Sequence, residues 1–145
     1  MDHRLGDRLI GYWDILRKDQ PMPSFNHLNS SAIADIWQNC LLFTVAKAAD
    51  DKPSTLSFYQ MGEKVRGMYG RDMVGHSFNT GQRHFQGAAI IKRVEEIISN
   101  PSTLTDVGQF VNERSKVVKY RSCLLPFGQD GKVTHILVGL SWREF

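Results

Sequence analysis

Cysteine is scarce in this sequence, because only Cys40 and Cys123 occur among its 145 residues. Each lies inside an apolar run, so we expect two free thiols packed as small hydrophobic side chains, and no disulfide or cysteine-based metal site. The longest apolar run, residues 40–46, is far shorter than the roughly 20 residues of a membrane helix. The start of the chain has no apolar segment typical of a secretion signal. We therefore expect a cytoplasmic protein outside the membrane.

The sequence also has no large excess of positive or negative charge. The net charge is +3 and the pI is about 9.0, with 23% charged residues scattered along the chain. Nucleic-acid-binding proteins usually gather Lys and Arg into a stripe or patch. We therefore expect no nucleic-acid partner.

Catalytic motifs are absent as well. The five histidines have neither H-x-x-x-H nor H-E-x-x-H spacing, and no serine lies in a nucleophile elbow. The paired acids at 50–51 and 95–96 are typical of a turn and of a solvated helix face. We expect no enzyme activity and no metal site.

One stretch comes close to a phosphate-binding motif, because residues 70–77 read GRDMVGHS. A P-loop has Lys where this sequence has His76, and it leaves a strand to begin a helix. Here a helical pattern precedes the loop. We therefore predict a structural turn.

Helical periodicity occurs in four segments. Residues 4–18 form an amphipathic pattern that Pro21 and Pro23 end, and residues 30–38 form a shorter one. A third helix is expected between Gly62 and Gly70. The fourth is long, beginning at His84 and ending at residues 100–101.

Extended patterns account for most of the rest. Residues 40–48 and 54–61 flank the turn residues DDKP and predict a hairpin, and residues 104–111, 117–127 and 133–142 predict a three-stranded meander. This order predicts an α+β domain with five antiparallel strands and helices on one face.

The stretch QMGEKVRGMYGRDMVGHSF resembles the PAS domain pattern, with a strand, a short helix between glycines and a G-R-x-x-x-G turn. It departs from that pattern at Gly62, where many PAS domains carry Asn. The helix containing Gly11-Tyr12-Trp13 and the final strands YRSCLLPF and HILVGLSW extend the resemblance over residues 10–143. It is closest to the single-domain PAS proteins common in alphaproteobacteria.

The resemblance implies a PAS fold with sheet order 2-1-5-4-3, an N-terminal helical extension at residues 1–38 and the PAS domain at 39–145. It implies a stand-alone sensory or regulatory domain in signal transduction, without an output domain of its own. Such a domain acts by binding a small ligand, a signalling protein partner, or both. A haem- or other cofactor-binding sensor is the alternative, and a small enzyme is a distant third.

Cofactor motifs of the family are weak here. Flavin photosensors carry a reactive cysteine after the short helix, and GRDMVGHSF has none. A haem-binding PAS domain offers a histidine from the long helix, for which His84 and His76 are weak candidates. We expect no cofactor beyond a small, largely apolar ligand.

Two sets of side chains are candidates for binding. The expected pocket between helices and sheet is lined by Phe58, Val65, Met68, Tyr69, Phe78, Phe85, Ile90, Val94, Tyr120 and Leu137, unless these are ordinary core. The first helix carries an apolar stripe that either covers its own sheet or forms a homodimer, as the family favours, through Leu5, Leu9, Tyr12, Trp13 and Leu16. Trp142 is a candidate for the same surface.

Overall fold

The computed structural model describes residues 4–46, 54–80 and 88–145. The pocket candidate Phe85 and the haem candidate His84 lie outside the described residues, as does the turn predicted at residues 50–53.

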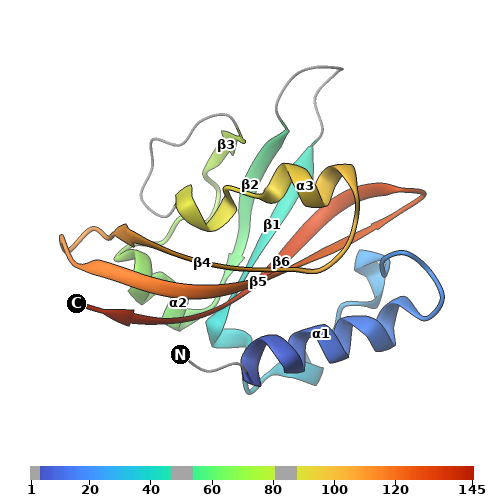
Figure 1. Cartoon of the computed structure of the whole chain (residues 1–145), viewed down its shortest axis with the longest axis horizontal. Helices are drawn as coiled ribbons and strands as arrows, with labels where there is room; N and C mark the ends of the chain where they lie inside the picture. Colours follow the sequence, from blue (N-terminus) through green and yellow to red (C-terminus); the bar gives the residue numbers. More distant parts are fainter. Residues whose placement is uncertain (1–3, 47–53, 81–87) are drawn as a thin grey trace.

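An antiparallel sheet forms the centre of the molecule (Figure 1). Its strands are β1 (Cys40–Ala46), β2 (Thr55–Met61), β3 (Ser77–Asn79), β4 (Leu104–Val111), β5 (Val117–Gln129) and β6 (Lys132–Glu144). They lie in the order β3-β2-β1-β6-β5-β4. The five predicted strands are confirmed in the order that the resemblance implied.

The number of strands was predicted wrongly, because β3 adds a sixth at the edge beside β2. It has only three residues, which is too short for a readable alternation of polar and apolar side chains. Its pairing with β2 includes a hydroxyl contact of 2.7 Å between Ser57 and Ser77.

The first and third predicted helices are confirmed, whereas the second and the described part of the fourth form shorter elements than predicted. The helical elements are α1 (Arg4–Arg17), η1 (Phe25–His27), η2 (Ser30–Ile33), η3 (Trp37–Asn39), α2 (Glu63–Tyr69), η4 (Ala88–Ile91) and α3 (Val94–Ser99). Residues 30–38 form two 3-10 turns in place of a helix, and the described part of the long fourth helix is divided between η4 and α3. Short helices are unstable alone, so packing decides their form.

The two faces of the sheet are covered differently. Helix α1 contacts β5 and β6 on one face, called here the outer face, while η4 lies over β4 on the opposite, inner face (Figure 1). At Gly139 of β6 an added Cβ would come within 2.2 Å of Leu9 Cδ1, so α1 needs a glycine at that point. Trp13 fixes the other end of the contact by donating from Nε1 to Pro126 O at 2.7 Å.

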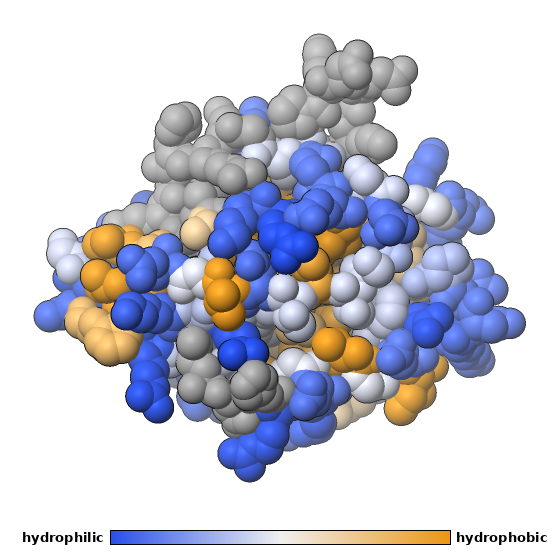
Figure 2. All heavy atoms as spheres, viewed as in Figure 1, coloured by the Kyte–Doolittle hydropathy of each residue, from blue (hydrophilic) through white to orange (hydrophobic). Residues whose placement is uncertain are grey.

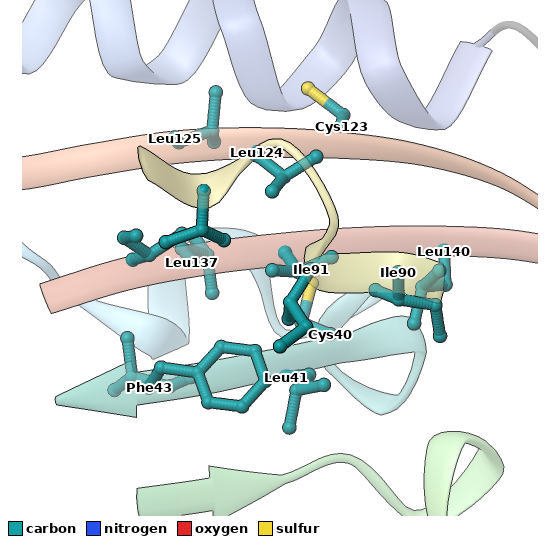
Figure 3. Packing of buried hydrophobic residues seen from close by; sticks show 14 of the residues in the cluster. Cys40, Leu41, Phe43, Ile90, Ile91, Cys123, Leu124, Leu125, Leu137 and Leu140 are labelled. Carbon is teal, nitrogen blue, oxygen red and sulfur yellow. The ribbon is translucent and has the colours of Figure 1, made fainter. Parts of the chain in front are cut away.

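Both cysteines lie on the face of the sheet that α1 covers. Cys40 and Cys123 both pair with Gly139, and Figure 3 shows the sulfur of Cys123 pointing toward α1. They are free and buried, as predicted, and burial raises the pKa of each thiol to about 12. The thiols therefore lie on the outer face.

A polar network joins α2 to the end of the sheet. The buried Asn112 donates from Nδ2 to Met68 O at 3.1 Å and to Glu144 Oε1 at 3.0 Å. Its Oδ1 accepts the backbone N–H groups of Arg114 and Lys116 at 3.0 and 3.1 Å. Arg114 also donates to Gly67 O at 2.8 Å. These bonds fix the position of α2 relative to the end of the sheet.

Hydrophilic residues dominate the surface in the view of Figure 2, and hydrophobic ones form small, separate patches. No helix in the described ranges combines the length and apolar character needed to cross a membrane.

Candidate functional site

Three buried hydroxyl groups gather on the inner face, and the first belongs to Tyr69. This residue ends α2 and is 1% exposed. Gly70 follows in the left-handed conformation, with φ of 89°, and ends the helix by donating to Arg66 O. The ring of Tyr69 contacts Phe58 edge-on at 6.0 Å and Phe110 at 5.6 Å between centroids. The helix end and these rings direct Tyr69 into the interior.

The second hydroxyl belongs to Tyr120 of β5, which is fully buried. Tyr120 pairs with Gly108 on β4, and its ring lies across that glycine. A Cβ at Gly108 would be 2.5 Å from Tyr120 Oη, so only glycine leaves room for the hydroxyl. Gly108 therefore determines where this hydroxyl lies.

The third hydroxyl belongs to Ser122, two residues further along β5 and 1% exposed. Because side chains alternate along a strand, Ser122 shares the inner face with Tyr120. Its partner on β4 is Asp106, whose Oδ2 lies 3.5 Å from Lys92 Nζ. Asp106 Oδ1 accepts the backbone N–H of Val107 at 2.9 Å. A carboxylate that forms an ion pair, but whose Oδ2 has no hydrogen bond in the described residues, thus lies beside Ser122.

None of the three hydroxyls has a hydrogen-bond partner within the described ranges. We call Tyr69, Tyr120 and Ser122 the hydroxyl cluster. An unpaired buried hydroxyl costs about 1–3 kcal/mol, so native proteins rarely keep several in one place without a partner. The three hydroxyls can therefore donate to a small polar group, such as a water molecule or part of a ligand.

The two phenols remain protonated donors at neutral pH. Burial raises the pKa of Tyr69 far above its ordinary value, and Tyr120 adds to the rise. Burial likewise raises the pKa of Tyr120, with a further contribution from the negative charge of Asp106. The ring of Phe110 lies 5.6 Å from that of Tyr69 and 6.2 Å from that of Tyr120 between centroids, so the two tyrosines belong to one cluster.

Most of the other predicted pocket residues surround the cluster or belong to the same core. Phe58 and Phe78 are 5.7 Å apart between ring centroids. Val65, Met68, Ile90 and Val94 are buried in α2, η4 and α3. The structure thus brings these candidates to the inner side of the sheet.

Leu137 does not belong to this group. It lies two residues from Gly139 on β6 and pairs with Leu42 and Leu125, so it faces the α1 side. Figure 3 includes it in the buried core. The placement predicted for Leu137 was wrong because β6 is buried on both faces and has no alternation to distinguish them.

Ser122, Asp106 and Gly108 were not among the site residues predicted from the sequence. The exposure of β4 alternates strictly from Leu104 to Val111, but the sequence LTDVGQFV does not alternate in polarity, because the exposed Val107 and Val111 are apolar. The alternation in exposure puts Asp106 and Gly108 at inward positions, which are unusual places for a carboxylate and a glycine. Pairing β4 with β5 then leads to Ser122.

The stripe on α1 is divided between the protein's own core and its surface. Leu9 and Trp13 are 0% and 5% exposed against the sheet, so they cannot contact a second copy while α1 stays in place. Leu5, Tyr12 and Leu16 are half-buried. Trp142 pairs with Tyr120 and lies on the inner face, which corrects its placement beside α1.

The remaining site candidates fall apart in space. His76 is exposed in the loop before β3, and no group of three metal-binding side chains occurs in the part of the chain that the structure describes. The GRDMVG loop leaves α2 and enters β3, with Gly75 at φ of 91°. Gly75 donates to Phe58 O at 2.9 Å, as expected for a structural turn.

The family model for the PAS domain matches residues 1–141. The chain belongs to the PAS domain family. The family is one of sensory signalling domains, and the PAS fold expected from the sequence is confirmed.

Solved structures are similar to this PAS domain at low sequence identity. A light-oxygen-voltage domain studied with a flavin analogue aligns with a TM-score of 0.56 and 11% identity, over 78% of this chain and 82% of that one. A Rhodobacter sphaeroides LOV protein aligns with a TM-score of 0.48 and 13% identity, over 79% and 68%. The first alignment supports the fold alone. No curated protein sequence matches the chain.

Proposed function

We propose that this PAS domain is a cytoplasmic sensory or regulatory domain that binds a small ligand at the hydroxyl cluster. The observation that carries the proposal is the set of three buried, unpaired hydroxyls of Tyr69, Tyr120 and Ser122. A ligand that supplied their partners would stabilise the folded state by mass action. The surrounding aromatic rings would hold its apolar part.

The signal leaves through a change in the surface offered to a protein partner. Tyr69 ends α2, and α2 is tied through Asn112 and Arg114 to Glu144 near the C-terminus. A ligand that shifts Tyr69 therefore acts on both ends of this network. The size of the shift is limited by the ligand's differential affinity for the two states.

A ligand at the hydroxyl cluster would not be bound through a reactive cysteine, as it is in the flavin photosensors. A thiol that bonds to a ligand must reach it, and both Cys40 and Cys123 lie on the outer face, opposite the hydroxyl cluster. Their raised pKa values also keep them as unreactive thiols. A ligand at the hydroxyl cluster is therefore held by hydrogen bonds and packing.

The test begins with the stability of the ligand-free protein. Tyr120→Phe and Tyr69→Phe each remove an unpaired hydroxyl and keep the ring, so the melting temperature should stay equal or rise. The matched control is Tyr12→Phe, because Tyr12 Oη accepts Asn29 N–H at 2.9 Å and donates to Asn29 O at 3.2 Å. That variant should melt lower.

A metabolite screen by thermal shift completes the test. A compound that raises the melting temperature of the wild type should do so less in Tyr69→Phe and Tyr120→Phe, and not at all in Val94→Trp, where an indole replaces a fully buried side chain of α3. Destabilised phenylalanine variants, together with no stabilising compound, would refute ligand binding at this cluster.

A further inference from the structure

The charges beside the hydroxyl cluster restrict which ligand it takes. Asp106 faces Ser122 across the β4–β5 pair, and its negative charge acts on Tyr120. Lys92 Nζ lies 3.5 Å from Asp106 Oδ2 and donates to Val107 O at 3.2 Å. The carboxylate is 12% exposed and the lysine 35%, so this pair lies at the boundary between the cluster and the surface.

An ionic ligand would have no counter-charge in this arrangement. Asp106 Oδ2 has no hydrogen bond in the described part of the chain, but its charge is offset by Lys92 at 3.5 Å, so neither residue supplies an ionic ligand with an unopposed counter-charge. Moving an ion out of water without a partner costs several kcal/mol even after relaxation. A neutral molecule avoids that cost, and the three hydroxyls remain as its polar contacts.

The chemistry of the hydroxyls defines the polar group. The two tyrosines are neutral donors whose protons have no acceptor in the described part of the chain, and Ser122 adds a third. A carbonyl oxygen has two lone pairs and accepts two such bonds at once. Its donors here come from α2 and from β5, so the oxygen would lie between the helix and the sheet.

We propose that the site takes a neutral, largely apolar ligand with a carbonyl-type oxygen that accepts hydrogen bonds from Tyr69 and Tyr120, with Ser122 as a further donor. This inference rests on the proposed function and adds the chemical class of the ligand. The position of the hydroxyls is set by Gly108, by the end of α2 and by the rings of Phe58 and Phe110.

Four probes of similar size distinguish the possibilities: acetophenone, ethylbenzene, benzoate and benzylamine. They share an aromatic ring and differ in carrying a neutral acceptor, no polar group, a negative charge or a positive charge. Binding to the full-length chain is measured by NMR titration of backbone amides. Acetophenone should bind most tightly, and its largest shifts should lie at the end of α2 and in β4 and β5.

Variants then assign the contacts. Tyr69→Phe and Tyr120→Phe should each weaken acetophenone by about three- to tenfold, the value of one neutral hydrogen bond, and leave ethylbenzene unchanged. Tyr12→Phe, which alters a hydroxyl beside α1, should leave both affinities unchanged. This control separates loss of a contact from loss of stability.

The results separate the two proposals. Ethylbenzene binding as tightly as acetophenone, or benzoate or benzylamine binding more tightly, would overturn the neutral-acceptor class and leave the ligand site intact. Binding of none of the four probes, with no stabilising compound in the metabolite screen, would remove the proposed function and this inference with it.

Discussion

At the scale of single residues, Gly108 and Tyr120 show how a missing side chain creates a polar site. The Tyr120 ring lies over Gly108 on the neighbouring strand, and a Cβ there would be 2.8 Å from Tyr120 Cζ as well as close to Oη. The hydroxyl therefore occupies space that any other residue on β4 would fill. A packing feature of two strands thus becomes a recognition feature.

Gly108→Ala should displace Tyr120 and lower the free energy of unfolding by about 1–3 kcal/mol, because the core must adjust to the added methyl. Denaturant unfolding measures this, and the same variant should lose the response to acetophenone. Gly67→Ala is the matched control, since a Cβ at Gly67 meets nothing within 4 Å. That change in the middle of α2 should stabilise the protein by about 0.5–1 kcal/mol. Equal effects of the two substitutions would contradict the proposed contact.

His135 predicts a pH dependence on the outer face. Its ring stacks on Phe25 at 3.6 Å with an interplanar angle of 5°, and burial lowers its pKa below the ordinary 6.5. The unfolded chain therefore binds a proton more readily than the folded one, so stability is present above pH 6.5 and declines as the pH falls. His135→Phe keeps the stacking and should reduce that decline in denaturant unfolding. An unchanged pH profile would contradict this assignment.

At the scale of elements, the small network around Asn112 links three parts of the chain. Its side chain satisfies a carbonyl at the end of α2, two N–H groups of the β4–β5 turn and the carboxylate of Glu144. Buried polar groups that lose such a partner are left unpaired. Asn112 therefore holds Tyr69 in place from a distance.

Asn112→Ala should lower the free energy of unfolding by about 1–3 kcal/mol, because several buried groups lose their partner. Amide exchange should then increase at the end of α2 before it does so in β5 and β6. Glu96→Gln serves as the control, since Glu96 pairs with Arg93 on an exposed helix face and should change stability little. Uniform exchange throughout the chain would argue against a local coupling.

The sequence predicted elements better where one face of an element is polar. Helix α1 has such a face, and α2 lies between two glycines that mark its ends. In β6 the residues from Ile136 to Leu140 are all buried, so the sequence could not reveal which of Ile136 and Leu137 faces the inner side. The three-residue β3 depends on pairing with β2 and has no pattern of its own. Tyr69 and Tyr120 were predicted, but Ser122 required the strand pairing.

At the scale of the whole molecule, the two faces of the sheet have different roles. The outer face is covered by α1, whose Leu9 and Trp13 complete the core. Deleting residues 1–19 would remove α1 and expose the apolar strands beneath it. A loss of self-association in that variant could therefore not be assigned to the surface of α1 alone. The expected homodimer through α1 must use its outward side chains, of which Ile15 is 75% exposed.

Ile15→Glu should convert a homodimer to a monomer in sedimentation experiments, because it puts a charge on the outward side of α1 and leaves Leu9 and Trp13 untouched. Val74→Glu is the control, since Val74 is 44% exposed in the loop after α2. A wild-type chain that is monomeric at high concentration would rule out this homodimer.

The central claim is that the hydroxyl cluster on the inner face binds a ligand, and a crystal structure of the purified protein with acetophenone tests it most directly. We expect electron density for a small molecule whose oxygen lies within hydrogen-bond distance of Tyr69 Oη and Tyr120 Oη, beside Ser122. Density that showed only water there, or hydroxyls paired with protein groups, would contradict it.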